Sequence, residues 1–330
     1  MTAQPAASVH RQIMDWRPEH AHSVLPMRAT HMLRQALVDG PVVAAGCFDP
    51  LSARLAEHVG FGALHVTGSG VEATQLGAPD LGLLTLSELA AHTARIAAAV
   101  DIPMICDVDT GFGGVDNIMR TVRELERSGV AGIHIEDQSF PKKSPLLDGR
   151  SILPRAEAVG RVQAALAART DPDFVVVARS DADAISFDEV VTRCNLYLEA
   201  GADAAFPMLM SYEGVPLHTL PRDQRIKVQR KLVEEIDGPV MAMAHPFGPD
   251  DPSVSDTVDT GAAIVITATV SLHAATNAML AVLQEMKDHG TASRHFDRNP
   301  ELISQYEVYQ LLGMDNYLDN HRRFLPPAGN

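Results

Sequence analysis

The sequence predicts an α/β protein built as a single (β/α)8 barrel, and the main reason is a repeated helix–glycine–strand pattern. Glycine is the usual residue just past the end of a helix. In each repeat the apolar run after the glycine shows no polar alternation, which is typical of a strand buried on both faces. The four repeats are EHVGFGALHV (57–66), ERSGVAGIHI (126–135), LEAGADAAFP (198–207) and VDTGAAIVIT (258–267).

Further apolar runs lie between these repeats, at residues 41–46, 102–109, 174–181 and 238–245. Eight strands are therefore expected, near residues 42, 63, 103, 132, 174, 203, 239 and 263. Helices are expected at residues 28–39, 50–59, 85–99, 114–128, 155–169, 187–200, 222–235 and 270–289. Alternation of strand and helix over about 250 residues favours a closed barrel. A doubly wound open sheet is the alternative, but the turn GCFDP (46–50) lacks its glycine-rich phosphate-binding pattern.

The two ends of the chain depart from this pattern. We expect residues 1–27 to form an N-terminal arm, residues 28–290 the catalytic barrel, and residues 291–330 a helical extension. The extension contains the amphipathic, aromatic stretch SQYEVYQLLGMDNYLDNHRRF, so we expect it to pack on another subunit. The alternative is a helix that covers the barrel's own surface.

The composition excludes several classes of protein. Of the 330 residues 46% are hydrophobic, enough for a large core, and the net charge of −15 disfavours a general nucleic-acid surface. No run of about 20 apolar residues is present, so no membrane span is expected. The N-terminus lacks the apolar core of a signal peptide. The three widely spaced cysteines form no disulfide framework and indicate a reducing compartment, so we expect a cytoplasmic protein.

Acidic side chains follow two neighbouring predicted strands. Asp107 and Asp109 alternate in CDVD, so both are expected to point toward the barrel axis, where Glu136 of the next strand would face them. Converging carboxylates repel one another unless a cation lies among them. Oxygen ligands favour a hard ion, so we expect Mg²⁺, with Mn²⁺ as the alternative. Helix caps and surface turns are the ordinary alternative, which suits Asp181 and Asp183 better.

Other polar groups also follow predicted strands. Arg179 is expected to clamp a substrate carboxylate with its planar guanidinium, and a buried ion pair with the acidic cluster is a compatible alternative. Ser69 and Gly70 offer backbone N–H groups at a helix start, which suit an anionic oxygen. For His134 and His245, contact with the site and a place in the core are both open.

The long segment QSFPKKSPLLDGRSIL (138–153) leaves the fourth strand at the expected metal site. Long loops at a barrel mouth are often lids, and Lys142 and Lys143 could neutralise a substrate anion or a developing enolate. A solvated surface loop is the alternative.

Several stretches resemble the isocitrate lyase/phosphoenolpyruvate mutase superfamily, in order and spacing, over residues 28–285. They are SARLAEHVGF, TGSGVEATQLGAPDLGLLTLSE, CDVDTGFGG, GIHIEDQSFPKK, LDGR and DFVVVARSDA. The resemblance implies an α/β barrel with Mg²⁺ at its mouth and small 2-oxo or 2-hydroxy carboxylates as substrates. It also implies a C-terminal helix swapped between the subunits of a dimer or tetramer.

The resemblance implies a role for each matching residue. These are metal binding for Asp107, Asp109 and Glu136, with Asp80 as an outer member; substrate binding for Arg179, Ser69 and Gly70; an active-site carboxylate at Asp49; and a gating-loop lysine at Lys142. We also expect Thr67 and His245 to bind substrate and Ser144 to have a catalytic role.

The chain departs from the carbon–carbon lyases of this superfamily at two places. Their loop carries a Cys-Gly-His sequence whose thiol protonates the leaving enolate, whereas this chain has Ser144, Pro145 and Leu146. They also carry a Glu where this chain has Met208. A lyase or decarboxylase acting on a small dicarboxylate, such as oxaloacetate or an alkylmalate, is the first interpretation. A phosphonopyruvate hydrolase or phosphoenolpyruvate mutase is the second, and a barrel that binds a carboxylate without catalysis is the third.

Overall fold

The computed structural model describes residues 28–299 and 304–325. The contacts divide the chain into two units, each of which is described by itself. One unit spans Met27–His273 and holds the barrel. The described part of the other comprises residues 274–299 and 304–325. The expected arm at residues 1–27 lies outside the described residues.

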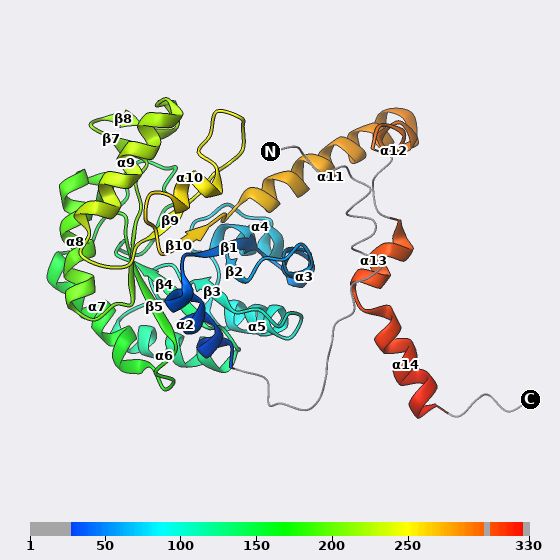
Figure 1. Cartoon of the computed structure of the whole chain (residues 1–330), viewed down its shortest axis with the longest axis horizontal. Coiled ribbons are helices and arrows are strands. Elements are labelled where there is room, and N and C mark those ends of the chain that lie inside the picture. The colour runs from blue at the N-terminus through cyan, green and yellow to red at the C-terminus, as the bar shows by residue number, and fades with distance from the viewer. Residues whose placement is uncertain (1–27, 300–303, 326–330) are drawn as a thin grey trace, which may run out of the picture. The chain divides into compact units, whose positions relative to one another are not determined.

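Within the described residues, eight parallel strands form the wall of the barrel (Figure 1). They are β1 (Val42–Cys47), β2 (Ala63–Val66), β3 (Met104–Asp107), β4 (Gly132–Glu136), β5 (Val175–Ser180), β6 (Ala204–Pro207), β9 (Met241–Met243) and β10 (Ile264–Ile266). Their hydrogen-bonded order is β6-β5-β4-β3-β2-β1-β10-β9. The Ala205 amide donates to the Pro239 carbonyl at 2.9 Å, and Ala205 pairs with Val240, so the two outer strands meet and the barrel closes. The predicted fold class is confirmed.

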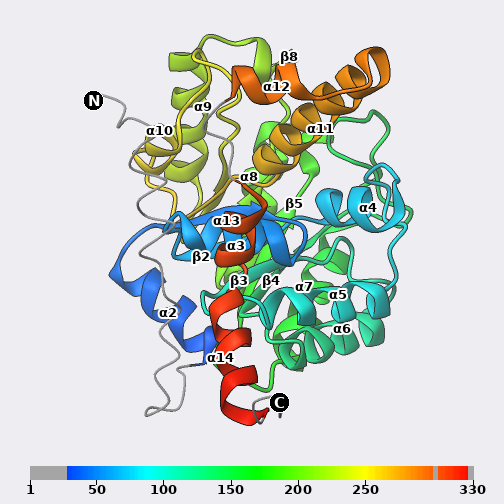
Figure 2. The same cartoon turned by 90° about the vertical axis from the view of Figure 1, so that its right-hand side faces the viewer.

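Helices lie outside the strands (Figures 1 and 2). They are α2 (Ala29–Asp39), α3 (Pro50–His58), α4 (Gly68–Leu76), α5 (Leu86–Ala97), α6 (Val115–Arg127), α7 (Arg155–Ala168), α8 (Phe187–Glu199), α9 (Arg222–Glu235) and α10 (Val254–Val258). The start of α4 agrees with the helix start expected at Ser69 and Gly70. Helix α10 was not among the expected helices, because its five residues are too few to show an apolar stripe. A short hairpin, β7 (Ser211–Tyr212) and β8 (Val215–Pro216), and a 3-10 turn, η2 (Leu217–Thr219), come between β6 and α9.

The alternation along each strand separates two apolar layers. Val175, Val177 and Phe206 belong to one buried cluster, while Cys106 and Val176 belong to the cluster that packs against α5 and α6. Asp107 follows Cys106, so its side chain points to the other face of the sheet. The same alternation therefore fills the core and carries polar side chains to the axis.

The second unit contains the end of α11 (Val270–His289), then α12 (Ser293–Arg298), α13 (Gln305–Leu311) and α14 (Met314–Phe324). Several large apolar side chains of α11 are 51–61% exposed: Met279, Leu280, Leu283 and Met286. The helical nature of the extension agrees with the sequence pattern, and its packing on another subunit stays a prediction. Among the described residues, no helix is long and apolar enough to cross a membrane.

Candidate active site

The strand ends open into one cavity of about 480 Å³ within the barrel unit. Its polar lining comes from successive strands: His65 and Thr67 from β2 and its end, Asp107 from β3, His134 from β4 and Arg179 from β5. The C-terminal mouth of a β/α barrel is where such enzymes hold their reactive groups. The predicted position of the site is therefore the position of the cavity.

Two of the three predicted metal ligands meet at the end of β3. Asp107 is the last residue of the strand, and Asp109 follows in a turn with a φ of 48°. The Asp109 amide donates to Asp107 Oδ1 at 3.0 Å, and its carbonyl accepts from the Glu136 amide at 2.9 Å. The sequence expectation that both aspartates alternate along a strand is thus wrong for Asp109. The left-handed turn, not the strand, brings it beside Glu136.

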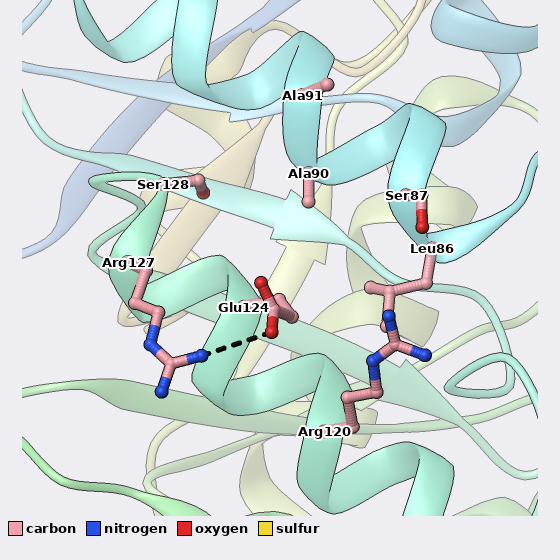
Figure 3. Close-up of a pocket in the computed structure, with 8 residues that line it drawn as sticks. All are labelled: Leu86, Ser87, Ala90, Ala91, Arg120, Glu124, Arg127 and Ser128. Carbon is pink, nitrogen blue, oxygen red and sulfur yellow. Dashed lines mark hydrogen bonds and ion pairs between the residues drawn. The ribbon is translucent and has the colours of Figure 1, made fainter.

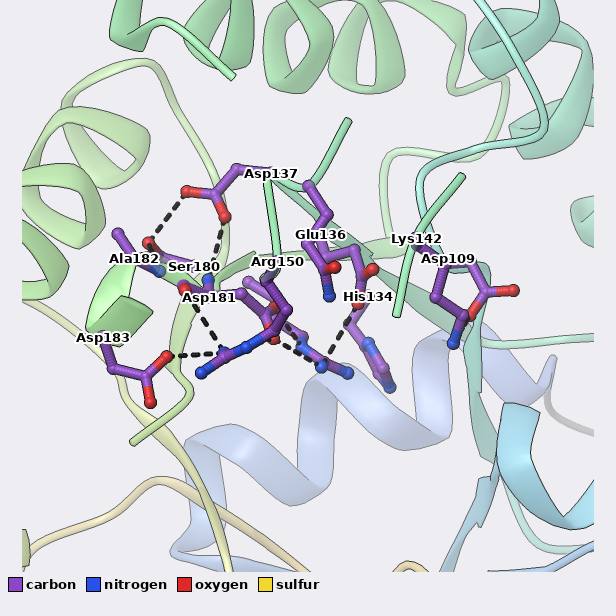
Figure 4. A network of polar contacts seen from close by, with 12 residues as sticks. Asp109, His134, Glu136, Asp137, Lys142, Arg150, Ser180, Asp181, Ala182 and Asp183 are labelled. Carbon is purple, nitrogen blue, oxygen red and sulfur yellow. Dashed lines mark hydrogen bonds and ion pairs between the residues drawn. The ribbon is translucent and has the colours of Figure 1, made fainter. Parts of the chain in front are cut away.

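Lys142 lies among these carboxylates (Figure 4). Its side chain is 3% exposed, forms an ion pair with Asp80, and places Nζ 2.6 Å from Asp109 Oδ1. Asp80 is held there through its loop, because the neighbouring amide of Leu81 donates to the buried Glu72 carboxylate at 2.8 Å. The loop lysine predicted from the sequence is therefore a buried member of the acidic cluster in this structure.

The cluster has unusual protonation equilibria. Burial opposes the charge of Lys142, but Asp109, Glu136, Asp107 and Asp80 outweigh it and raise the pKa of the ammonium. Burial raises the pKa of Asp109 to about 7, with Lys142 acting against the rise. Burial also raises the pKa of Glu136 well above its ordinary value, although Arg179 opposes this. The buried carboxylates therefore repel one another, and the single ammonium of Lys142 offsets only part of their negative charge.

The donor set fits a hard cation. Neither oxygen of the buried Glu136 carboxylate accepts a hydrogen bond from a described residue, although Arg179 Nη2 lies 3.2 Å from Oε2. A Cβ at Gly68 would lie 3.0 Å from Asp107 Oδ2, so glycine leaves that oxygen accessible. Among residues 28–299 and 304–325, no three Asp, Glu, His or Cys side chains are grouped closely enough to hold an ion directly. Mg²⁺ usually keeps several waters, so an ion held partly through water suits this spacing.

Arg179 is fixed by a carboxylate behind it. Its Nε donates to Asp181 Oδ2 at 2.7 Å and its Nη2 to Asp181 Oδ1 at 2.9 Å, and the guanidinium carbon lies 5.6 Å from the centre of the Phe206 ring. One edge of the fork is therefore bound to Asp181, while the residue lines the cavity. Both roles considered for Arg179, ion pair and ligand clamp, are compatible with this geometry.

Asp181 and Asp183 are not the caps and surface turn residues that the sequence suggested. Both side chains are fully or almost fully buried. Arg150 Nη1 lies 2.6 Å from Asp183 Oδ1 and 3.3 Å from Asp181 Oδ1 (Figure 4). The expectation was wrong for two reasons: Asp181 pairs mainly with Arg179, two residues before it, and Asp183 pairs with Arg150, which lies in the distant loop and leaves no local pattern.

The loop at residues 138–153 is anchored at both ends. Gln138 pairs with Ile152 in an antiparallel bridge, and the Gln138 side chain exchanges two hydrogen bonds with the Lys143 backbone at 2.9 and 3.0 Å. Lys143 Nζ donates to the Asp148 carbonyl at 3.1 Å within the loop itself. The predicted charge-neutralising role is therefore open to Lys142, which lies in the cluster, and not to Lys143 in this arrangement. Ser144 lies on the cavity wall.

Two buried histidines form the floor of the polar end. His65 and His134 stack with ring centres 5.1 Å apart, and their Nε2 atoms are 2.8 Å apart. Burial lowers the pKa of His65 to about 3 and that of His134 to about 4, so both rings are neutral near pH 7. His134 Nδ1 lies 3.6 Å from Asp107 Oδ1, which favours a proton on that nitrogen and a hydrogen bond from His65 to His134. His134 thus lines the site and is hydrogen-bonded through Nε2 to His65, whereas its buried Nδ1 has no hydrogen-bond partner among the described residues.

The other predicted residues divide into two groups. Thr67, Ser69 and His245 line the cavity. Asp49 does not line it and instead caps α3, where its carboxylate accepts from the Ser52 amide at 2.7 Å. Gly70 is buried behind the lining, and a Cβ there would come within 2.8 Å of Phe48. Asp49 therefore supports the fold around the site in this structure, and Gly70 is closely packed in the first turn of α4.

Sequence reasoning missed His65 and the apolar wall of the cavity. His65 precedes Thr67 by two residues, just as His134 precedes Glu136, so strand alternation could have shown that it points inward. The apolar wall comes from Phe206, Met208 and segments that follow β6, and Met208 is only 4% exposed. Its residues are separated along the chain and share no period.

A second depression lies on the outer helices α5 and α6 (Figure 3). It is lined by Leu86, Ser87, Ala90, Ala91, Arg120, Glu124, Arg127 and Ser128. Arg127 forms an ion pair with Glu124 at 3.1 Å. None of the predicted site residues lies there, so this depression adds nothing to the site at the barrel mouth.

The chain matches known proteins over most of its length. Residues 33–287 match the family model described as phosphoenolpyruvate phosphomutase. The chain is 38% identical to a 2-methylisocitrate lyase of Aeropyrum pernix over 278 residues, which cover 84% of each protein. It is 37% identical to a 2,3-dimethylmalate lyase of Eubacterium barkeri over 276 residues, covering 83% of this chain and 90% of that one.

Solved structures agree with these relatives. A structure of oxaloacetate acetylhydrolase with the inhibitor 3,3-difluorooxalacetate has a TM-score of 0.80 and 29% identity, covering 92% of this chain and 99% of that one. A phosphonopyruvate hydrolase in complex with oxalate and Mg²⁺ has a TM-score of 0.77 and 30% identity, covering 91% and 100%. The predicted enzyme class, a carbon–carbon lyase, is confirmed by the relatives. This chain belongs to the phosphoenolpyruvate phosphomutase family, within the isocitrate lyase/phosphoenolpyruvate mutase superfamily.

Proposed function

We propose that the protein is a Mg²⁺-dependent lyase or decarboxylase that acts on a small 2-oxo or 2-hydroxy dicarboxylate, of the oxaloacetate or alkylmalate type, through an enolate. One observation carries the proposal: Asp80, Asp107 and Arg179 line a single cavity. Arg179 also lies 3.2 Å from Glu136, a member of the acidic cluster that includes Asp109 and Lys142. A cation-binding acidic cluster beside a guanidinium is suited to a ligand with a carboxylate and an adjacent oxygen.

The chain's own residues would hold the substrate at the polar end. Arg179, pre-oriented by Asp181, binds one carboxylate, and the amides of Ser69 and Gly70 at the start of α4 favour negative charge nearby. Asp107, Asp109 and Glu136, with Asp80 further out, would hold the metal. When bound, Mg²⁺ supplies Lewis-acid stabilisation of the negative charge that develops on the substrate.

Proton supply favours decarboxylation among the reactions of this class. Ser144 stands on the cavity wall where the related lyases carry their acidic thiol, and a hydroxyl is a poor proton donor near neutral pH. Decarboxylation places the smallest demand on such a group, because water can protonate the enolate after CO₂ has left.

The test is a substrate panel with purified full-length protein and Mg²⁺. We expect the protein to convert oxaloacetate to pyruvate, or an alkylmalate to its oxo acid. EDTA should abolish this turnover. Arg179→Lys, which loses the planar fork, should lower kcat/KM by about 100-fold. Arg155→Lys is the matched control, because Arg155 pairs with Glu189 on the exposed surface. Phosphate release from phosphonopyruvate, without turnover of any dicarboxylate, would overturn the proposal in favour of C–P chemistry.

We further propose that the protein is a homo-oligomer, a dimer or a tetramer. The exposed apolar side chains Met279, Leu280, Leu283 and Met286 on α11 support this, since large apolar patches usually mark interfaces. A monomeric mass in light scattering at micromolar concentration would contradict it.

A further inference from the structure

One wall of the active-site cavity is apolar and continues beyond the polar end. It is formed by Phe206, Met208, Met210, Leu217, Ile226 and Met243. These come from β6, the segment after it, η2, α9 and β9. The wall begins directly beside the polar end, because the Phe206 ring contacts both Arg179, at 5.6 Å, and His134, at 5.5 Å. A ligand held by Arg179 therefore reaches this wall.

The cavity is larger than a four-carbon diacid requires. Its volume of about 480 Å³ lies in the range of roughly 300–1,000 Å³ typical of sites for drug-sized ligands. The diacid core of the proposed substrate would occupy the polar end, where Thr67, Asp107 and Arg179 line the cavity. The rest of the lining includes Met208, Met210 and Ile226, whose side chains offer no strong hydrogen bonds, together with polar residues such as His218 and Gln229.

The charges around the apolar wall disfavour a further anion. Among the residues that line the cavity, the arginines are Arg179 and Arg225. Arg225 is already paired, with Nη1 2.8 Å from Asp251 Oδ1 and Nη2 2.6 Å from the Asp250 carbonyl. The same end of the cavity carries the carboxylate of Asp256. Apart from His65 and His134, the other basic side chains of the lining are His218, His245 and His273, and burial lowers the pKa of His245. A third substrate carboxylate would therefore lose its water here without gaining a free guanidinium or ammonium group.

We propose that the site selects dicarboxylates with an uncharged aliphatic or aryl substituent on the carbon next to the second carboxylate, and rejects tricarboxylates. This substrate class rests on the proposed function and narrows it. For a 3-alkylmalate, the C2–C3 bond breaks, the C2 hydroxyl loses its proton as it becomes the aldehyde of glyoxylate, and C3 gains a proton from water. The products are glyoxylate and the corresponding alkanoate, so atoms and charge balance.

Binding tests this selectivity without requiring turnover. The ligands are succinate, propylsuccinate and hexylsuccinate, which lack the C2 oxygen and cannot be cleaved, and propane-1,2,3-tricarboxylate. Titration calorimetry of the full-length protein with Mg²⁺ should show affinity rising about threefold to fourfold for each buried methylene. Propane-1,2,3-tricarboxylate should bind at least tenfold more weakly than propylsuccinate. Affinity that stays flat along the alkyl series, or a tighter tricarboxylate, would overturn the inference.

A matched pair of variants locates the effect. Ile226→Glu places a carboxylate in the apolar wall, on a half-buried helix position that tolerates a polar side chain, and should abolish the gain with alkyl length. Gln224→Glu adds the same charge on the exposed surface of the same helix and should keep the gain. An equal loss in both variants would contradict a role for this wall.

Turnover separates this inference from the proposed function. Chain-length-dependent binding with cleavage of 3-hexylmalate supports both. If affinity depends on chain length in the same way but no malate or oxaloacetate is cleaved, the result supports binding at the apolar wall and contradicts the lyase proposal. If oxaloacetate is cleaved but affinity does not depend on alkyl length, the result supports the lyase proposal and contradicts the selectivity proposed for the apolar wall.

Discussion

Asp181 binds one full edge of the Arg179 guanidinium, at 2.7 Å to Nε and 2.9 Å to Nη2, with both side chains buried at the end of β5. The two residues are separated by only one position along the chain. The ion pair fixes the direction in which Arg179 presents the rest of its fork to the cavity. Arg179 also lies 3.2 Å from Glu136, so the same pair links the ligand clamp to the acidic cluster.

Replacing Asp181 with Asn should therefore impair both stability and binding. Removing one partner of a buried ion pair typically costs about 3–5 kcal/mol, and Asn retains part of the hydrogen bonding, so we expect a loss of about 3 kcal/mol. Urea unfolding measures it. Asp223→Asn, which removes the exposed pair with Lys227, is the control and should change little. An Asp181→Asn variant that is as stable as the control and binds oxalate with Mg²⁺ as tightly as the wild type would show that the pair does not orient Arg179.

Gly68→Ala should weaken metal-dependent activity while the barrel stays folded. The new Cβ would lie 3.0 Å from Asp107 Oδ2 and 3.2 Å from Asp107 Cγ, so the aspartate must move. We expect at least a tenfold rise in the Mg²⁺ concentration needed for half-maximal activity. Gly160→Ala is the matched control, because its Cβ meets nothing within 4 Å and it lies in helix α7, where Ala is favoured over Gly by about 0.5–1 kcal/mol. Unchanged Mg²⁺ dependence in Gly68→Ala would place the metal elsewhere.

Lys142→Met should make the protein more dependent on divalent ions for stability. The buried ammonium is the cation that offsets Asp80 and Asp109, so without metal we expect a loss of about 3 kcal/mol. Mg²⁺ then has no competing cation and should raise Tm more in the variant than in the wild type. Thermal unfolding with and without Mg²⁺ measures this. Lys143→Met serves as control, since Lys143 bonds only within its own loop; an equal response of the two variants would contradict the account.

The neutral His65–His134 pair should make stability fall below neutral pH. Burial lowers the pKa of His65 to about 3, below its ordinary value near 6.5, so the unfolded chain takes up a proton first as the pH falls. The stability that depends on a neutral His65 is fully present above pH 6.5 and is lost as the pH falls toward 3. The free energy of unfolding then falls by up to about 1.4 kcal/mol per pH unit. Replacing His65 with Gln removes this titrating group, so the unfolded variant takes up one proton fewer than the unfolded wild type as the pH falls. Urea unfolding between pH 7 and 4 should show a shallower pH dependence in the variant, and identical slopes would refute the neutral pair.

The sequence predicted the barrel because buried parallel strands and glycine-terminated helices leave local patterns. It placed Asp107, Glu136 and Arg179 correctly at the mouth for the same reason, since each ends an apolar run. It could not show that Asp109 leaves the strand in a left-handed turn, because that conformation depends on contacts with Asp107 and Glu136.

The remaining features depend on residues that are far apart in the chain. The burial of Asp183 follows from Arg150, and the buried position of Lys142 follows from Asp80, which Glu72 holds in place through its loop. No periodicity relates these positions, because loops and not one regular helix or strand bring them together. The residues on strands were therefore placed by their local patterns, whereas the contact of Lys142 with Asp80 and the contact of Asp183 with Arg150 followed from no local pattern.

The central claim is that carboxylates at the ends of β3 and β4 bind a divalent cation that is required for ligand binding at Arg179. Titration calorimetry with oxalate tests it most directly, on the wild type and on Glu136→Gln, in Mg²⁺ and in EDTA. We expect oxalate to bind the wild type only when Mg²⁺ is present, and Glu136→Gln to bind it at least tenfold more weakly. Equal oxalate affinity in Mg²⁺ and in EDTA would contradict the claim.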